Sequence, residues 1–143
     1  MTEILITPAT IEDFRKISER VEQGGGNMYP HAQVEYEILV AKINGKIAGY
    51  CEYEYNGQHE GMIKSIEVFP EFQKKGIGNK LRMEVENTIA KRGARYIRVV
   101  AAHDPNDETR RTKIEAYYRK QGYERGELYK GLPSMLKEHR PRR

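Results

Sequence analysis

Hydrophobic positions along this chain recur with two periods, one typical of helices and the other typical of strands. Three segments have helical spacing: Ile11–Glu22, a stretch from Ile77 to about Arg92, and a stretch that ends before Gly122. Strand-like segments fill most of the remainder, namely Ile4–Ile6, Tyr36–Ile43, Lys46–Tyr55, Gly61–Phe69, Tyr96–Ala101, Tyr123–Glu127 and Pro133–Lys137. Strands interspersed with helices predict an α/β fold, in which the apolar fifth strand is expected to lie near the centre of the sheet.

Capping residues indicate where the helices begin and end. Thr10, with Asp13 three residues later, is typical of a helix N-cap, whereas Gly93 and Gly122 are typical of residues that end a helix. The expected buried stripes are Ile11, Phe14, Ile17 and Val21 on the first helix, Ile77, Leu81, Val85 and Ile89 on the second, and Ile114, Tyr117, Tyr118 and Gln121 on the third.

Glycine-containing pairs mark the turns. Asn44-Gly45 is a strong hairpin signal, and a second Asn-Gly follows at Asn56-Gly57, so three consecutive strands are expected to pair antiparallel. Gly24-Gly25-Gly26-Asn27 is expected to end the first helix and to open a mobile connection. The chain is then expected to be irregular or briefly helical over Met28–Gln33.

Length and composition indicate one globular domain, which we place at residues 1–138 with a basic tail at residues 139–143. The chain has 143 residues, of which 38% are hydrophobic and 32% are charged. No apolar run approaches the roughly 18 residues of a membrane span, and the opening Met1-Thr2-Glu3 leaves no room for a signal peptide. Cys51 is the single cysteine, which excludes an internal disulfide. We therefore expect a cytoplasmic protein without a membrane partner.

The net charge of +4 is modestly basic, and much of the excess lies in two places. One is the cluster Lys74–Arg82, and the other is the tail Lys137–Arg143. Such a balance suits an anionic cofactor, nucleic acid or simply solubility. The tail is expected to be a disordered, solvated end. Nucleic-acid binding is therefore not needed to explain the charge.

The run from Ile63 to Gly78 is the most informative part of the chain. It predicts a strand that ends at Pro70, a turn rich in lysine and glycine, and then the first turn of a helix. The N-terminus of a helix presents backbone N–H groups and favours negative charge. Gly76 and Gly78 let the backbone approach a ligand closely, and Lys74 and Lys75 add positive charge. This pattern predicts a pyrophosphate site.

Two familiar phosphate-binding motifs are excluded at this loop. A P-loop requires lysine and then Ser or Thr after its last glycine, but Gly78 is followed by Asn79 and Lys80. A dinucleotide-binding fingerprint requires a third glycine where this chain has Leu81. What remains is Gln-x-x-Gly-x-Gly after a Val-x-Pro strand end.

This loop resembles the acyl-CoA loop of the Gcn5-related N-acetyltransferase (GNAT) family, and the order of the elements matches that fold over about the whole chain. The resemblance implies a mixed, mostly antiparallel central sheet flanked by helices. It also implies that the fourth and fifth strands splay apart and that the pantetheine arm of acetyl-CoA lies between them. Acetyl-CoA would then be the cosubstrate.

The resemblance also assigns roles to individual residues. The loop would bind the phosphates of acetyl-CoA, and the strand end before it would pair with the pantetheine amides through its backbone. These residues are Gln73, Lys74, Lys75, Gly76, Ile77, Gly78 and Asn79 in the loop, and Ile66, Glu67 and Val68 on the strand. Tyr118, four residues before Gly122, matches the Tyr-x-x-x-Gly-Phe signature whose hydroxyl protonates the departing thiolate; the alternative is a packing aromatic. Arg111 stands where many relatives have asparagine.

The general base is left open by the sequence. The position that often holds a glutamate in the family is Met62 here, so that role cannot be carried over. Glu67 is the candidate carboxylate beside the expected thioester, but its alternation with Ile66 and Val68 can turn its side chain away, and a water is an equal candidate. Glu52, Glu54, Glu60 and His103 are the other titratable candidates. No metal is expected, because the histidines lack ligand spacing, and Cys51 is expected to be a buried small residue.

These observations favour an N-acetyltransferase that passes acetyl directly from acetyl-CoA to a primary amine in a ternary complex. The first helix, the Gly24–Asn27 loop and Tyr50, Tyr53 and Tyr55 are expected to form the acceptor side. The acceptor can be a small molecule, a peptide or protein amine, or an aminoacyl-tRNA, and a homodimer is one option for the assembly. Two alternatives remain, a CoA-binding module without catalysis and a basic nucleic-acid-binding domain.

Overall fold

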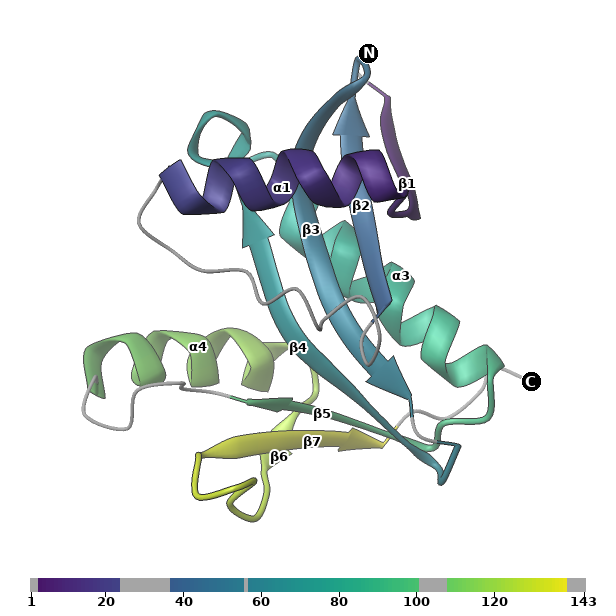
Figure 1. The fold of residues 1–143 in the computed structure, drawn as a ribbon. Coiled ribbons are helices and arrows are strands. Elements are labelled where there is room, and N and C mark those ends of the chain that lie inside the picture. The colour runs from purple at the N-terminus through teal and green to yellow at the C-terminus, as the bar shows by residue number, and fades with distance from the viewer. Residues whose placement is uncertain (1–2, 24–36, 56, 101–107, 139–143) are drawn as a thin grey trace. The chain divides into compact units, whose positions relative to one another are not determined.

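The computed structural model describes residues 3–23, 37–55, 57–100 and 108–138 (Figure 1). Its helices and strands follow the predicted order closely. They are β1 (Ile4–Pro8), α1 (Ile11–Gln23), β2 (Glu37–Ile43), β3 (Lys46–Tyr55), β4 (Glu60–Val68), the 3-10 helix η1 (Pro70–Phe72), α3 (Ile77–Lys91), β5 (Tyr96–Val100), α4 (Glu108–Lys120), β6 (Glu124–Arg125) and β7 (Ser134–Glu138). The predictions for Gly24–Asn27, Met28–Gln33, Tyr36, Ala101 and the tail at 139–143 lie outside the described residues.

The strands form a seven-stranded sheet in the order β1-β2-β3-β4-β5-β7-β6. The pairs β1–β2, β2–β3, β5–β7 and β6–β7 are antiparallel, whereas β4 and β5 are parallel. This arrangement confirms the predicted mixed, mostly antiparallel sheet with flanking helices. The fifth strand has neighbours on both sides, as its apolar sequence predicts.

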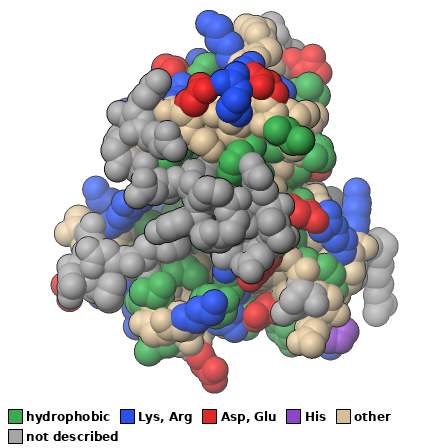
Figure 2. Space-filling model, in the orientation of Figure 1, with side chains coloured by type: hydrophobic (Ala, Val, Ile, Leu, Met, Phe, Trp, Pro, Cys, Tyr) green, Lys and Arg blue, Asp and Glu red, His purple; other side chains and the backbone are tan. Residues whose placement is uncertain are grey.

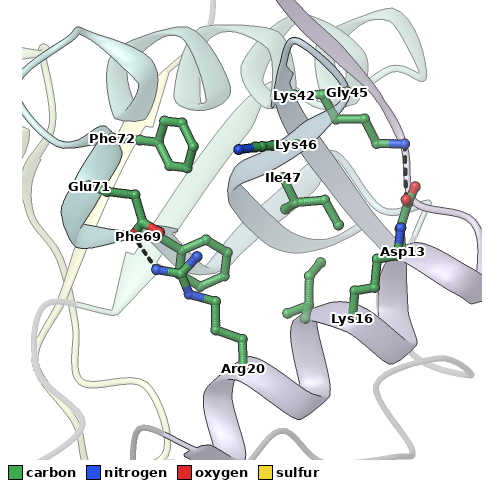
Figure 3. A pocket seen from close by; sticks show the side chains of 11 residues that line it. Asp13, Lys16, Arg20, Lys42, Gly45, Lys46, Ile47, Phe69, Glu71 and Phe72 are labelled. Carbon is green, nitrogen blue, oxygen red and sulfur yellow. Dashed lines mark hydrogen bonds and ion pairs between the residues drawn. The ribbon is translucent and has the colours of Figure 1, made fainter.

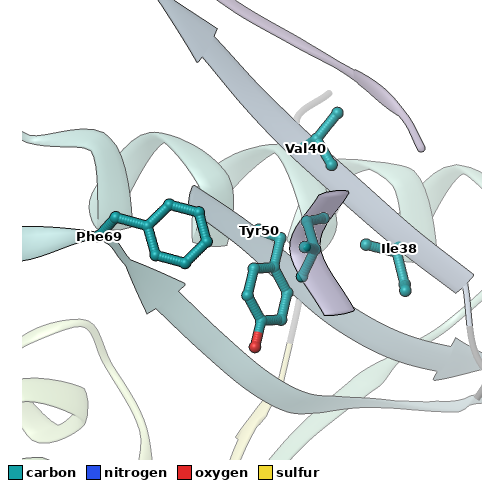
Figure 4. Packing of buried hydrophobic residues seen from close by; sticks show 5 residues of the cluster. Ile38, Val40, Tyr50 and Phe69 are labelled. Atoms are coloured by element: carbon teal, nitrogen blue, oxygen red, sulfur yellow. The ribbon is translucent and has the colours of Figure 1, made fainter. Parts of the chain in front are cut away.

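The chain forms two compact units, and each is described by itself. The first comprises Met1–Glu54 and Ser65–Val85, and the second comprises Tyr55–Lys64 and Glu86–Arg143. In the first unit, α1 crosses one face of the strands and packs its Ile17 into a core cluster (Figures 1 and 4). The other members of this cluster are Ile38, Val40, Tyr50 and Phe69.

The start of α1 confirms the predicted cap. The Thr10 N–H donates to Asp13 Oδ2 and the Asp13 N–H donates to Thr10 Oγ1, each at 3.0 Å, which satisfies two N–H groups at the helix start. Lys42 Nζ lies 2.9 Å from Asp13 Oδ1. Burial of Asp13 opposes its ionisation, but the hydrogen bonds from Thr10 and Lys42 outweigh burial and hold the pKa of the carboxyl below its usual value.

Ile11, which was predicted to belong to the buried stripe of α1, lies outside it. Ile17 is 1% exposed, but Ile11 is 88% exposed. Successive helical residues are about 100° apart, so Ile11 lies about 120° around the helix from Ile17, outside the apolar face. Exposed ion pairs occupy the solvent side of α1, where Arg15 bridges Glu12 and Glu19. Figure 2 shows basic and acidic side chains gathered side by side at the top of the view.

Both helices that glycine was predicted to end have the expected C-terminal geometry. Gly93 and Gly122 adopt φ values of 109° and 93°, which favour glycine. The N–H of the following residue returns to the helix in each case, from Ala94 to the Ile89 carbonyl and from Tyr123 to the Tyr118 carbonyl. Gln121, predicted to lie on the buried face of α4, follows the helix, which ends at Lys120.

The second unit holds a buried carboxylate that the sequence did not reveal. Glu86 is 5% exposed and accepts a hydrogen bond of 2.6 Å from the Tyr123 hydroxyl, while Lys137 Nζ lies 3.4 Å from its other oxygen. Tyr123 was predicted to begin a strand extending to Glu127, but β6 covers only Glu124–Arg125. Tyr123 therefore precedes β6, and its buried side chain anchors the chain directly after α4.

Gly49 lies where β3 approaches the predicted pantetheine strand. A Cβ atom at this position would come 2.5 Å from the Glu67 carbonyl oxygen and 3.2 Å from the Val68 Cα. We expect Gly49→Ala to lower the free energy of unfolding by about 1–3 kcal/mol, because backbone atoms cannot yield as a flexible side chain can. Urea denaturation measures this change. Gly126→Ala, whose Cβ would meet only ordinary contacts, is the control, and equal stability of the two variants would contradict the expectation.

Candidate functional site

The candidate site begins where β4 ends. The Phe69 N–H donates to the Ala48 carbonyl at 2.9 Å, which keeps the chain beside β3 for one more residue. The short helix η1 follows, starting with Pro70, whose fixed φ suits the first position of a helix. The Gln73 N–H then donates to the Pro70 carbonyl at 3.3 Å and closes this turn. The strand end thus leads directly into the predicted loop.

The loop is fastened to the strand and reversed by two left-handed residues. Gln73 Nε2 donates to the Val68 carbonyl at 3.0 Å, so the glutamine side chain bridges the base of the loop. Lys74 and Gly76 have φ values of 64° and 76°. The Gly76 carbonyl accepts the first α-helical hydrogen bond of α3, from the Lys80 N–H at 3.1 Å. Gly76 is therefore the residue at which the loop becomes a helix.

The charge at this helix start favours an anion. The first turn of an α-helix has backbone N–H groups without an intrahelical partner, and here the turn begins at Ile77 and Gly78. Lys74 and Lys75 are exposed beside it, and no acidic residue lies in the first turn of α3. Ile77 is 1% exposed and anchors the start of the helix. This arrangement can hold phosphate oxygens through backbone amides and lysine charge.

The end of β4 alternates as the sequence predicted. Ile66 and Val68 are half-buried, whereas the Glu67 side chain is exposed. In the parallel pair with β5, the register joins Glu60–Ile63 to Tyr96–Val99, and β4 continues beyond it to Val68. The backbone at Ile66, Glu67 and Val68 therefore lies beyond the last residue of β4 that pairs with β5. The family resemblance implies that the pantetheine arm binds along this part of β4. Its binding role stays a prediction.

Tyr118 belongs to the second unit, whereas the loop belongs to the first. Its side chain is 9% exposed and its ring meets those of Tyr117 and Tyr123 edge to face, with centroids 5.0 and 5.2 Å away. Its carbonyl accepts hydrogen bonds from the Gln121 and Tyr123 N–H groups. These contacts fix the backbone and ring of Tyr118. Its role as an acid stays a prediction.

Two tyrosines expected on the acceptor side are core residues. Tyr50 and Tyr53 are 4% and 2% exposed, and the Tyr50 ring lies 6.2 Å from that of Phe69. Burial, with the charges of Glu67 and Glu52 adding to it, raises the pKa of Tyr50 above its usual value. Tyr55 is half-buried. The strand tyrosines thus contribute mainly to packing.

Glu115 is a buried charge that sequence reasoning missed. It is 8% exposed and lies among three arginines, at 3.8 Å from Arg111, 3.9 Å from Arg119 and 3.0 Å from Arg125. The spacing of four residues within α4 could have indicated the pairs with Arg111 and Arg119, but nothing local indicates Arg125. Arg111, which stands where many relatives have asparagine, therefore has a structural partner in Glu115.

The remaining predictions concern a metal site, Cys51, His103 and a membrane span. Within residues 3–23, 37–55, 57–100 and 108–138, no group of three or more His, Cys, Asp or Glu side chains could hold a metal ion. Cys51 is buried as predicted, and burial raises the pKa of its thiol. His103 lies outside the described residues. Among the described helices, none has the length and apolar character to cross a membrane.

Comparison with known proteins gives a consistent result. A sequence model of the acetyltransferase (GNAT) family matches residues 6–124. A search of curated proteins finds no match.

Solved structures with a similar fold include a PaiA N-acetyltransferase from Thermoplasma acidophilum in complex with coenzyme A. Its TM-score is 0.71 at 18% identity, over 96% of this chain and 99% of that one. A GNAT family acetyltransferase from Elizabethkingia anophelis with acetyl-CoA bound has a TM-score of 0.70 at 18% identity, over 95% and 98%. Ard1 from Thermoplasma volcanium has a TM-score of 0.71 at 16% identity, over 94% and 97%.

Proposed function

This chain belongs to the acetyltransferase (GNAT) family, and on that premise we propose that it transfers an acetyl group from acetyl-CoA to a primary amine. The transfer is direct, within a ternary complex of protein, acetyl-CoA and amine. We assign the activity to one domain at residues 1–138, followed by a basic tail at residues 139–143.

The observation that carries this proposal is the loop Gln73–Asn79 at the start of α3. It combines a left-handed glycine, exposed lysines and a helix N-terminus without an acidic residue in its first turn. These features suit the pyrophosphate of CoA. Two of the similar structures hold CoA or acetyl-CoA, which supports the same ligand class here.

The proposed roles divide between backbone and side chains. Acetyl-CoA supplies the activated acetyl group as a thioester. The backbone of Ile66, Glu67 and Val68 pairs with the pantetheine arm, and an N–H group of this strand end polarises the thioester carbonyl. Lys74 and Lys75 balance phosphate charge. Tyr118 gives its hydroxyl proton to the sulfur that leaves, as a general acid.

The attacking amine must be neutral, so a base has to accept its proton. The Glu67 carboxylate is exposed and can take that proton directly or through a water.

An amine-panel assay tests the proposal. The protein is mixed with acetyl-CoA and polyamines, amino sugars, lysine peptides or peptide N-termini, and free CoA is measured before mass spectrometry of the product. Transfer to one class supports the proposal. CoA binding without transfer to any amine would favour a CoA-binding module. A salt-dependent RNA complex that CoA does not displace would favour the nucleic-acid alternative.

The side chain of Gln73 provides a milder test of the loop. Gln73→Ala removes the hydrogen bond to the Val68 carbonyl and loosens the base of the loop. A hydrogen bond of this kind contributes about 0.5–1.5 kcal/mol, so we expect CoA affinity to fall roughly two- to tenfold. Calorimetric titration measures the change. Gln58→Ala, outside the loop, is the control, and equal affinities in both variants would show that the bridge does not support CoA binding.

A further inference from the structure

A pocket of about 410 Å³ lies in the first unit between α1, the turn from β2 to β3, and η1 (Figure 3). Its apolar wall consists of Ile17, Ile47, Phe69 and Phe72, of which Ile17 and Phe69 are buried. A volume of this order is typical of sites for small molecules. The residues that line it include none of those assigned to acetyl-CoA or to the chemistry of transfer.

The charged side chains of this pocket are unbalanced. Four are cationic and two are anionic, and they are Lys16, Arg20, Lys42 and Lys46 against Asp13 and Glu71. Both carboxylates are already paired, Asp13 with Lys42 and Glu71 with Arg20. The Arg20 guanidinium also lies 3.8 Å from the centroid of the Phe69 ring, which holds it against the wall. The lining therefore carries two more positive charges than negative ones, and the surplus falls on Lys16 and Lys46. Besides the hydrogen bond that an arginine donates to each carboxylate, the charge of Lys46 also lowers the pKa of Glu71 and that of Lys16 lowers the pKa of Glu12.

The two lysines come from opposite sides of the pocket. Lys16 extends from α1 toward Asp13, whereas Lys46 extends from the hairpin in the direction of Phe72 (Figure 3). Both lysines are exposed, while Ile17 is 1% and Phe69 8% exposed. The pocket therefore has a cationic rim above an apolar floor.

We propose that this pocket binds a small organic anion, either a carboxylate or a phosphate monoester, joined to a compact apolar group. The anionic end lies between Lys16 and Lys46, and the apolar group packs against Ile17, Ile47 and Phe72. A charged hydrogen bond to each lysine is stronger than a neutral one, and burial of the apolar group adds to the affinity. A cationic amine is repelled by the same rim, so the proposal separates the part of α1 that lines this pocket from the acceptor side, where the sequence analysis had placed the whole helix. The proposal is independent of the proposed acetyl transfer.

Methyl NMR on isoleucine-labelled protein tests the proposal with residue resolution. Phenyl phosphate and benzoate are titrated separately, with benzyl alcohol and benzylamine as neutral and cationic analogues of similar size. We expect saturable shifts of the Ile17 and Ile47 methyl signals with at least one anion and none with the analogues. The Ile77 methyl reports on the separate loop at the start of α3, whether or not CoA binds there.

Charge reversal identifies the groups responsible. The double variant Lys16→Glu/Lys46→Glu should weaken binding at least tenfold, whereas Lys91→Glu/Lys113→Glu, an equal change of net charge at exposed positions outside the pocket, should leave it unchanged. Thermal melting confirms that both variants fold. Equal weakening in both variants, a response at Ile77 alone, equal binding of inorganic phosphate, or no saturable shift up to roughly 10 mM would each overturn the proposal.

Discussion

Gly78→Glu should remove detectable CoA binding while leaving the fold intact. A glutamate here places a negative charge in the first turn of α3, where the proposal puts the pyrophosphate. Like charges held together cost several kcal/mol, which corresponds to a loss of affinity of at least about a hundredfold. The fold should tolerate the change, because a Cβ at Gly78 would lie 3.7 Å from Val68 Cγ2 and because acidic residues stabilise helix N-termini. Calorimetric titration with CoA and thermal melting measure the two effects.

Two controls separate the causes of that loss. Gly78→Gln adds nearly the same bulk without charge, and Asn87→Glu adds the same charge at an exposed position later in α3. We expect an intermediate affinity for the first and an unchanged affinity for the second. NAD and ATP should bind the unaltered protein much more weakly than CoA. A Gly78→Glu protein that keeps full CoA affinity would remove the basis of the proposed function.

Tyr118→Phe should reduce kcat by about 10²–10⁴-fold, the usual contribution of a general acid. The substitution removes one proton donor but keeps the ring, which packs against Tyr117 and Tyr123. The backbone is held separately by the hydrogen bonds to the Tyr118 carbonyl, so the melting temperature should change little. The loss should fall on kcat more than on KM, because protonation of the leaving sulfur occurs in the transition state.

Tyr117→Phe is the matched control. The two side chains are neighbours in sequence but point about 100° apart on α4. A kinetic defect in Tyr117→Phe alone would mean that the tyrosine signature is displaced by one residue. Small and equal effects in both variants would leave Tyr118 with a packing role only.

The parts of the fold that local chemistry determines could be predicted from the sequence. The starts of β3 and α3 lie where predicted, since Asn44-Gly45 and the glycine loop impose turns there. The start of α4 at Glu108 could not be predicted, because the first half of that helix is polar and has no apolar stripe. The length of β6 depends on its pairing with β7, which no local pattern specifies.

The candidate site likewise has parts that could be predicted from the sequence and parts that depend on the folded structure. The loop is contiguous in sequence, so its strand, turn and helix start could be identified together. The tyrosines of β3 could not be assigned to a face, because residues Ala48, Gly49, Tyr50 and Cys51 are all buried and alternation carries no information there. Lys16 and Lys46 lie thirty positions apart, and only the packing of α1 against the hairpin brings them to one pocket.

The tyrosine cluster at the end of α4 also gives this protein an optical signature. The chain has ten tyrosines and no tryptophan, so tyrosine dominates its near-ultraviolet absorption. Tyr117, Tyr118 and Tyr123 are held edge to face at 5.0 and 5.2 Å, close enough for their electronic transitions to couple. Coupled rings in a fixed asymmetric arrangement produce circular dichroism that vanishes when side-chain packing is lost. The residue proposed as the acid therefore lies inside a natural chromophore that reports the packing of its own surroundings without any label.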